Sequence, residues 1–373
     1  MNNDESYSPD WAPQDPNDAF TVKVRKGING ESGIRKNFPE TPKRRPALTV
    51  DNYVKGVLRN DKTILARAVT LIESNSPGHY QTAREVLKTL LPHSGRSIRV
   101  GITGVPGGGK STLIESLGCH LIDRGHKVAV LAIDPSSTIT KGSILGDKTR
   151  MEKLARQQDC FIRPSPSEGA LGGVTRKTRE TILVCEAAGY DAILIETVGV
   201  GQNEITVRSM VDFFLLVMIA GAGDELQGMK KGVIELADAL LVNKADGPDK
   251  TRAALARKEY AAALKYLAPA TEGWETKAAT CSALTGEGIP EIRHQIETFE
   301  KLTKKTGFFE KRRKNQSLAW VFSMIENYLK ENFHNNQDVH KKLPHIKDQI
   351  LKGTILPTTA AEDLLKTYYL SKK

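Results

Sequence analysis

The spacing of apolar residues changes twice along the chain. From Asp51 to Leu91 they recur at three- and four-residue intervals, which is typical of amphipathic helices. Between about Ser97 and Phe299, short apolar runs alternate with helical stretches. After Lys314 the helical spacing returns. The pattern therefore predicts two or three helices, then an α/β core, and then a helical C-terminal part.

The apolar runs of the middle segment predict the strands of a sheet. Strands that alternate with helices are typical of a mainly parallel sheet that is covered by helices on both faces. We therefore expect an α/β fold with helical extensions at both ends. The predicted strands are Ile98–Ile102, Val128–Ile133, Cys160–Arg163, Ala192–Glu196, Phe213–Ile219, Ala239–Asn243 and Ala278–Cys281.

The two ends of the chain differ in composition. Residues 1–46 are rich in Pro, Asn, Asp and Gly and poor in aliphatic residues, so we predict a disordered tail. A helical region over 47–96, an α/β domain over 97–305 and a helical region over 306–373 follow. The last region carries an apolar stripe that either packs on the core or faces a second subunit. The stripe consists of Leu318, Val321, Phe322, Ile325, Leu329 and Phe333.

The bulk composition is that of a protein with an ordinary core. Hydrophobic residues make up 39% and charged residues 26% of the 373 positions. No apolar run approaches the roughly 18 residues that a membrane span requires, and the start of the chain lacks the pattern of a secretory signal. We expect a cytoplasmic protein that does not bind membranes. The four cysteines are scattered, which favours reduced, structural thiols.

The net charge of +10 raises the question of a nucleic-acid partner. The 54 basic residues stand against 44 acidic ones along the whole chain. The clusters Lys43–Arg45 and Lys311–Lys314 are short and contain no interleaved aromatic residues. We therefore expect no nucleic-acid binding, and interpret these clusters as solvated faces or docking patches for an acidic partner.

A phosphate-binding loop is the strongest motif of the sequence. Residues 104–111, GVPGGGKS, fit the pattern GxxxxGK[ST] between a predicted strand and a helix that begins at Lys110. Glycines allow backbone N–H groups to surround a β-phosphate, and the helix start adds its positive dipole end. Lys110 supplies charge to the β- and γ-phosphates, and Ser111 offers a hydroxyl to Mg²⁺. The candidate nucleotide-binding residues here are Gly104, Pro106, Gly107, Gly108, Gly109, Lys110, Ser111 and Thr112.

Two weaker motifs indicate which base is bound. Residues 243–246, NKAD, follow a predicted strand and match the NKxD pattern, in which Asp246 accepts two hydrogen bonds from guanine. Residues 281–284, CSAL, match a loop that supports the guanine oxygen. The order of the motifs favours GTP over ATP. The candidate base-binding residues are Asn243, Lys244, Asp246, Ser282, Ala283 and Leu284.

The segment ETVGVGQNE predicts a loop that responds to the γ-phosphate. Glu196 ends a strand and is suited to hold Mg²⁺ through water, and the backbone N–H of Gly199 is suited to meet the γ-phosphate. The first glutamine is Gln202 rather than the residue after this glycine, so we predict slow hydrolysis by the isolated protein. Asp134 and Asp147 are each a Mg²⁺ ligand, a group that orients water, or a cap or turn residue.

The whole set of motifs resembles the MeaB/ArgK family, the GTPase chaperones of methylmalonyl-CoA mutase, within the SIMIBI class of P-loop GTPases. Its human relative is the methylmalonic aciduria type A protein. The resemblance covers about Asp51 to Phe333 and rests on GVPGGGKS, AIDPSS, ILGDKTRM, ETVGVGQNE, GAGDELQGMKKG and NKAD in this order. It implies binding of GTP and GDP with Mg²⁺, hydrolysis of GTP, and a homodimer through residues 306–373. It also implies an adenosylcobalamin-dependent acyl-CoA mutase as partner.

The resemblance also implies roles for single residues. Lys110 and Ser111 would hold phosphate and Mg²⁺, with Asp134, Asp147 and Glu196 around the metal. Asn243, Lys244 and Asp246 would read guanine. A third switch loop maps to Gly223–Lys231, with Asp224, Lys230 and Arg150 as its signalling side chains. Lys230 would reach the phosphates when the partner docks and act as an arginine finger does. The sequence departs mildly from the family at Lys148, where arginine is common.

Three other functions compete with this interpretation. GTPases that insert nickel or zinc carry His-rich tracts or a CxCC-like motif, whereas the eight histidines here are dispersed. A P-loop kinase or ATPase linked to amino-acid transport would need an acceptor pocket and a base. A nucleotide-dependent assembly module would need no catalysis. The base-reading motifs and the glycine-rich switch loops favour a regulatory GTPase.

Overall fold

The computed structural model describes residues 48–134, 151–166, 171–197, 203–221 and 231–371. Residues 48–373 form one compact unit by their contacts. The predicted disordered tail lies outside the described residues. So do the basic cluster Lys43–Arg45 and the loops around Asp147, Gly199 and Lys230.

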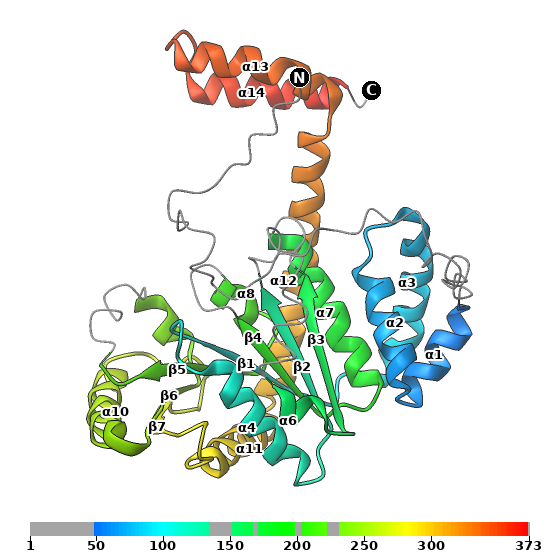
Figure 1. Cartoon of the computed structure of the whole chain (residues 1–373). Helices are drawn as coiled ribbons and strands as arrows, with labels where there is room; N and C mark the ends of the chain where they lie inside the picture. Colours follow the sequence, from blue (N-terminus) through cyan, green and yellow to red (C-terminus); the bar gives the residue numbers. More distant parts are fainter. Residues whose placement is uncertain (1–47, 135–150, 167–170, 198–202, 222–230, 372–373) are drawn as a thin grey trace, which may run out of the picture. The chain divides into compact units, whose positions relative to one another are not determined.

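A seven-stranded sheet forms the centre of the described chain, in the order β3-β2-β4-β1-β5-β6-β7 (Figure 1). All six strand pairs are parallel, so the predicted α/β class is confirmed and the sheet is more regular than the expected mainly parallel one. The strands are β1 Ile98–Gly104, β2 Val128–Asp134, β3 Cys160–Pro166, β4 Ala192–Thr197, β5 Phe213–Ile219, β6 Ala239–Asn243 and β7 Lys277–Thr280.

Helices cover both faces of the sheet, because parallel strands need crossover connections. One face packs on α4 (Lys110–Ile122), α6 (Glu152–Ala155) and α11 (Ile289–Lys305). The other packs on α7 (Leu171–Ala187) and α8 (Asn203–Arg208), with α10 (Lys250–Leu264) over β5 and β6. Short 3₁₀ helices lie at Leu91–His93, Lys231–Leu236 (η3) and Gly247–Asp249. Side chains alternate between the two cores: Ile193 and Ile195 of β4 enter one, and Leu194 enters the other.

The predicted N-terminal helices are α1 (Val50–Leu58), α2 (Lys62–Glu73) and α3 (Pro77–Leu90). Asp61 caps α2, because its carboxylate accepts hydrogen bonds from the backbone N–H groups of Thr63 and Ile64 at 2.8 and 3.1 Å. The apolar faces of the three helices share one buried cluster with α7 and with β2 to β5. Arg163 of β3 also forms an ion pair with the buried Glu73 of α2. The N-terminal helices therefore belong to the core of the protein.

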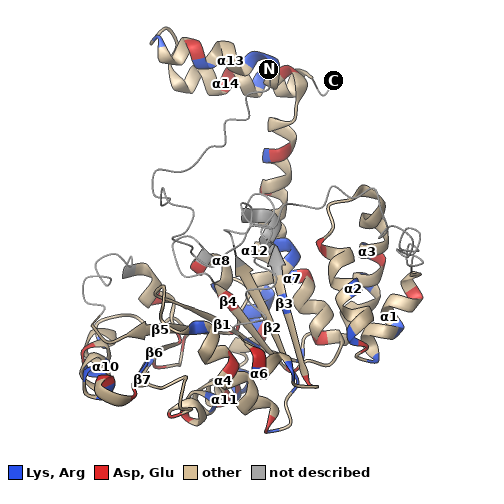
Figure 2. Cartoon of the chain, in the orientation of Figure 1, with Lys and Arg blue, Asp and Glu red and all other residues tan. Residues whose placement is uncertain are grey.

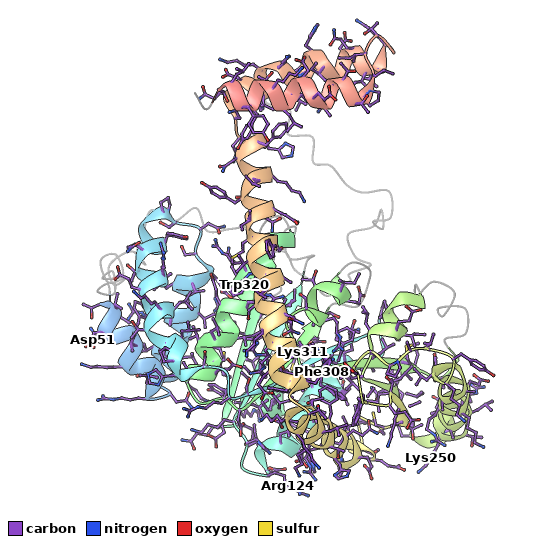
Figure 3. All side chains as sticks on the ribbon, turned by 180° about the vertical axis from the view of Figure 1, so that it is seen from behind. Asp51, Arg124, Lys250, Phe308, Lys311 and Trp320 are labelled. Carbon is purple, nitrogen blue, oxygen red and sulfur yellow. The ribbon has the colours of Figure 1, made fainter. Side chains whose placement is uncertain are left out.

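The C-terminal part consists of α12 (Phe308–His334), α13 (Gln337–Leu351) and α14 (Pro357–Leu370). The predicted stripe lies on α12, whose course Figure 3 marks with Phe308, Lys311 and Trp320. Phe322 exposes 64% of its surface, and its apolar neighbours on the stripe are also largely open. Only Phe333 is half-buried, where it packs on Tyr368 of α14, and the described core leaves the rest of the stripe open. A second subunit on the stripe stays a prediction.

The start of α12 is anchored in the core by the basic cluster Lys311–Lys314. Arg313 binds the buried Asp212 through two hydrogen bonds of 2.8 and 2.6 Å. Arg312 bonds to the backbone oxygen of Asp212 and lies over the ring of Phe308. Lys311 and Lys314 are exposed. The expected solvated face or docking patch is thus wrong for the two arginines, which bind inward to carboxylates far away in the sequence. On the described helices of Figure 2, basic and acidic residues are interspersed.

Buried ion pairs continue along the edge of the sheet where β1, β5 and β6 begin. Asp238, directly before β6, accepts from Arg208 of α8 at 2.6 and 3.2 Å and from the backbone N–H of Phe214 at 2.9 Å. Glu186 of α7 accepts from Arg99 of β1 at 2.9 and 3.0 Å. These carboxylates are buried and each has several donors, as a buried charge requires. We call this group the amino-edge network: Arg99, Glu186, Arg208, Asp212, Asp238, Arg312 and Arg313.

Candidate functional site

The glycine-rich loop follows β1 and leads into α4, as the motif predicts. Gly104 has a φ of 146°, and a Cβ there would lie 1.9 Å from the backbone oxygen of Val217. Gly109 has a φ of 80°, and its Cβ would lie 2.7 Å from Nδ2 of Asn243. Only glycine fits both positions, because they combine left-handed or strained backbone with close neighbours. Pro106 and Gly107 are exposed and Gly108 is buried.

Lys110 is the first residue of α4 and exposes only 8% of its surface. Its ammonium donates to the backbone oxygens of Gly104 and Val105, both at 3.0 Å. Burial lowers the pKa of Lys110, and the carboxylates of Glu196 and Glu204 partly oppose this shift. A buried cation that binds only neutral carbonyls is well placed to transfer to a phosphate, whose charge would stabilise it further.

Ser111 and Glu196 meet at the carboxyl ends of β1 and β4. The Ser111 hydroxyl donates to Oε1 of Glu196 at 2.8 Å. Nearby, the buried hydroxyls of Thr197 and Thr103 are joined at 2.8 Å, which fixes the two strand ends to each other. A hydroxyl and a carboxylate side by side next to a phosphate-binding loop are ligands that suit Mg²⁺. The residues present therefore fit the metal that the sequence leads us to expect.

Asn243 links the two halves of the candidate site. Its Nδ2 donates to the backbone oxygen of Gly108 at 2.8 Å, and its Oδ1 accepts from the backbone N–H of Ala283 at 3.0 Å. The Cys281 thiol donates to the same Oδ1 at 3.3 Å. The side chain is buried, so the phosphate loop and the loop 281–284 are held at a fixed separation. In this arrangement both ends of the Asn243 amide bind protein.

The remaining base-binding candidates surround Asn243. Lys244 is exposed and has a φ of 59°, an uncommon backbone conformation for a residue other than glycine. Ala245, by contrast, is buried, and its N–H bonds to the Cys281 oxygen, which places Asp246 beside the loop 281–284. Ser282 is buried and accepts from the N–H of Thr285, whereas Leu284 is 80% exposed. The exposed side chains of Lys244 and Leu284 are available to a planar base.

The structure describes only part of the predicted metal and switch residues. The backbone of Asp134 ends β2, one residue after Ile133, which pairs with Thr197 at the end of β4. Asp147, Arg150, Gly199, Asp224 and Lys230 lie outside the described residues. Thr112, one residue after Ser111, is exposed. The roles of all these residues remain predictions.

Sequence reasoning missed Glu204. It belongs to the same ETVGVGQNE segment as Glu196, but only the fold shows that it is 7% exposed and that its charge acts on Lys110. The sequence signal for it is a glutamate in the first turn of the helix that follows the switch segment, at a position that the fold buries.

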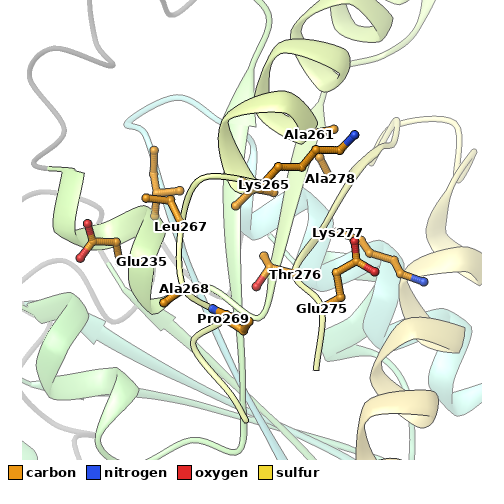
Figure 4. A pocket seen from close by; sticks show the side chains of 12 residues that line it. Glu235, Ala261, Lys265, Leu267, Ala268, Pro269, Glu275, Thr276, Lys277 and Ala278 are labelled. Atoms are coloured by element: carbon orange, nitrogen blue, oxygen red, sulfur yellow. The ribbon is translucent and has the colours of Figure 1, made fainter. Parts of the chain in front are cut away.

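A separate cavity of ≈ 540 Å³ lies between α10, η3 and β7 (Figure 4). Its lining mixes aliphatic side chains with two acidic and two basic ones, among them Glu235 and Lys265. None of the predicted nucleotide-binding residues belongs to this lining. The candidate site is therefore defined by the phosphate loop rather than by this cavity.

Comparison with known proteins shows which family the chain belongs to. The model of the family "Methylmalonyl Co-A mutase-associated GTPase MeaB" matches residues 65–338. The chain belongs to the MeaB family. It is therefore a GTPase and binds guanine nucleotides, as the sequence motifs predict.

Several relatives support this membership. A probable GTPase of Mycobacterium tuberculosis is 48% identical over 87% of this chain and 97% of its own length. GTPase ArgK of Escherichia coli is 43% identical over 85% and 96%, and the mitochondrial methylmalonic aciduria type A homolog of Mus musculus is 41% identical over 86% and 79%. The crystal structure of an LAO/AO transport system kinase matches with a TM-score of 0.71 at 36% identity, over 85% of this chain and 96% of that one.

None of the described helices is both long and apolar enough to cross a bilayer.

Proposed function

We propose that this member of the MeaB family uses GTP binding and hydrolysis to assist an adenosylcobalamin-dependent acyl-CoA mutase, most directly methylmalonyl-CoA mutase. The observation that carries the proposal is the nucleotide site itself. Lys110, Ser111 and Glu196 gather at the carboxyl edge of a sheet, and Asn243 ties their loop to the base-binding loop. The family description and the methylmalonic aciduria type A relative point to the mutase as partner. The mutase as partner is an expectation from the sequence. The cytoplasmic location is another.

The roles of the site residues follow from their positions. Lys110 would leave the backbone oxygens of Gly104 and Val105 to bind the β- and γ-phosphates. Ser111 and Glu196, together with Asp134 and Asp147, would hold Mg²⁺, which supplies positive charge against the phosphates when it is bound. Asp246 would accept hydrogen bonds from guanine. Asn243 would act mainly by holding the two loops in place.

The partner would complete the hydrolytic machinery. In the sequence, Asp224 and Lys230 lie between β5 and η3, and Arg150 precedes α6; we expect all three to act at the site in the complex. A cation that reaches the phosphates only in the complex would stabilise transition-state charge, in agreement with the slow hydrolysis that we predict for the protein alone.

A homodimer through α12 is part of the same proposal. A contiguous exposed apolar stripe usually marks an interface, and every stripe residue on α12 except Phe333 is exposed in the described chain. A light-scattering mass of one chain at micromolar concentration would contradict the dimer.

The test of the partner is a GTP turnover assay with the full-length protein, alone and with methylmalonyl-CoA mutase. We expect the mutase to raise the rate of GTP turnover. Lys230→Ala should lower this stimulated rate by at least about tenfold, because a charge finger contributes strongly to phosphoryl transfer. Lys258→Ala, a loss of an exposed lysine on α10, is the matched control and should retain the increase. Turnover that the mutase leaves unchanged, or phosphate transfer to a protein instead of water, would contradict the proposal.

A further inference from the structure

A second cavity, of ≈ 320 Å³, adjoins the candidate nucleotide site. Its lining includes Thr112 of α4 together with Ala283 and Leu284 of the base-binding loop. We propose that this cavity receives the ribose of the bound nucleotide, and that Glu115, which also lines it, is a specificity-determining residue whose carboxylate accepts a hydrogen bond from a ribose hydroxyl. The inference rests on the nucleotide site proposed above. It adds a contact that distinguishes ribonucleotides from deoxyribonucleotides.

The covalent structure of a nucleotide leads its sugar into this cavity. Ribose joins the phosphates to the base, so it must lie between the two protein loops that would hold them. The phosphate loop continues into α4 at Ser111 and Thr112, and the base-binding loop contains Ala283 and Leu284. Asn243 keeps the two loops at a fixed separation, because its amide bonds to both. The cavity is lined from both loops and therefore lies on the path of the sugar.

The face of α4 that lines the cavity offers one carboxylate close to the phosphates. Thr112 and Glu115 are three residues apart, so they are neighbours on one face of the helix. Asp123, the other acidic residue of the lining, lies about 16 Å further along the helix than Thr112. A sugar attached to a phosphate at the start of α4 does not extend that far. Glu115 is therefore the carboxylate of the lining that a ribose can reach.

Glu115 is held in position by a neighbouring helix. Its Oε1 accepts the backbone N–H of Lys153, in α6, at 2.7 Å. Its Oε2 has no hydrogen bond or ion pair to a residue that the structure describes, and the side chain is only half-buried. A carboxylate that is fixed through one oxygen still has acceptor capacity for a ligand. The ribose hydroxyls are matching donors, and a hydrogen bond to a charged acceptor is stronger than one between neutral groups.

The experiment measures the affinities of the full-length protein for GDP, 2′-deoxy-GDP and 3′-deoxy-GDP by calorimetry with Mg²⁺. We expect GDP to bind more tightly than at least one of the deoxynucleotides by roughly tenfold, because the missing hydroxyl removes a hydrogen bond to a charged group. Glu115→Ala should weaken GDP by the same factor and leave that deoxynucleotide nearly unchanged, so the ratio of the two affinities falls toward one. Glu115→Gln keeps a neutral acceptor for both the sugar and the Lys153 N–H, and its ratio should lie in between.

The matched control is Glu291→Ala on α11. Glu291 is exposed and follows Pro290, which lines the cavity, but Glu291 itself does not line it. Its variant removes the same charge from the same region and should keep the original ratio. An effect of the lost charge on the phosphates would change the affinities of all three nucleotides together, whereas a change in the ratio is specific to the hydroxyl contact.

Three results would overturn the inference and leave the proposed function intact. The first is equal affinity of the unsubstituted protein for GDP and both deoxynucleotides. The second is an unchanged ratio in Glu115→Ala while GDP still binds. The third is a ratio that falls in Ser116→Ala, a neutral neighbour in the same lining, but not in Glu115→Ala. A failure of the unsubstituted protein to bind GDP at all would instead contradict the nucleotide site.

Discussion

The two edges of the sheet treat buried charge in opposite ways. At the edge where β1, β5 and β6 begin, the amino-edge network gives every buried carboxylate an arginine, and Asp212 and Asp238 each accept a backbone N–H as well. At the edge where β1 and β4 end, Lys110 is buried but donates only to backbone oxygens. The first edge is electrostatically satisfied by the chain itself. At the second edge, Lys110 has no salt bridge to a described residue, and a bound phosphate would supply the anionic partner.

This difference teaches where stability and function lie. Removing one partner from a completed buried ion pair leaves the other charge stranded, which destabilises the fold. Removing a cation that donates only to backbone oxygens among the described residues costs the fold less and the ligand much. The same type of substitution should therefore have opposite consequences at the two edges.

The largest expected effect is on nucleotide binding, at Lys110. Lys110→Ala should weaken GTP and GDP binding by at least about 1,000-fold, because the phosphates lose their only buried cation among the described residues of the loop. The free energy of unfolding should change by less than about 1 kcal/mol, since a desolvated charge is removed together with its packing. Calorimetric titration and urea denaturation of the same sample measure both values. An unchanged affinity for the nucleotides, or a strongly destabilised protein, would contradict the difference between the two edges.

The next effect is on stability, at the opposite edge. Asp238→Ala should lower the free energy of unfolding by about 3 to 5 kcal/mol, because it strands Arg208 and removes the acceptor of the Phe214 N–H. Urea denaturation measures the loss. The protein that remains folded at low temperature should still bind GDP. A loss of less than about 1 kcal/mol would show that the amino-edge network is not what holds α8 and α12 to the sheet.

The smallest of the three effects concerns selectivity at the carboxyl edge. Asp246→Asn should weaken GTP by roughly 100-fold and improve binding of xanthosine triphosphate, because the amide donates where the carboxylate accepted. Competition binding with GTP and xanthosine triphosphate measures how far the preference shifts from the first nucleotide to the second. Unfolding should be nearly unaffected, since Asp246 forms no pair with the buried arginines of the amino-edge network. Equal loss for both nucleotides would indicate damage to the loop instead of a change in base reading.

Much of this protein was determined by short stretches of its sequence. The phosphate loop, the start of α4 at Lys110 and the positions of the strands follow from contiguous residues, because glycine geometry and hydrophobic spacing act over a few positions. β5 and β6 were predicted to the residue. The order of motifs was enough to indicate the family.

Only the tertiary structure decided which distant residues meet. Arg313 pairs with Asp212, 101 positions earlier, and Asn243 reaches Gly108, 135 positions earlier. The segment Lys311–Lys314 has the composition of a solvated cluster, yet its arginines turn inward because buried carboxylates at the strand starts need partners. A sequence fixes the chemistry of each side chain, but which charges share a low-dielectric interior depends on how the helices pack against the sheet.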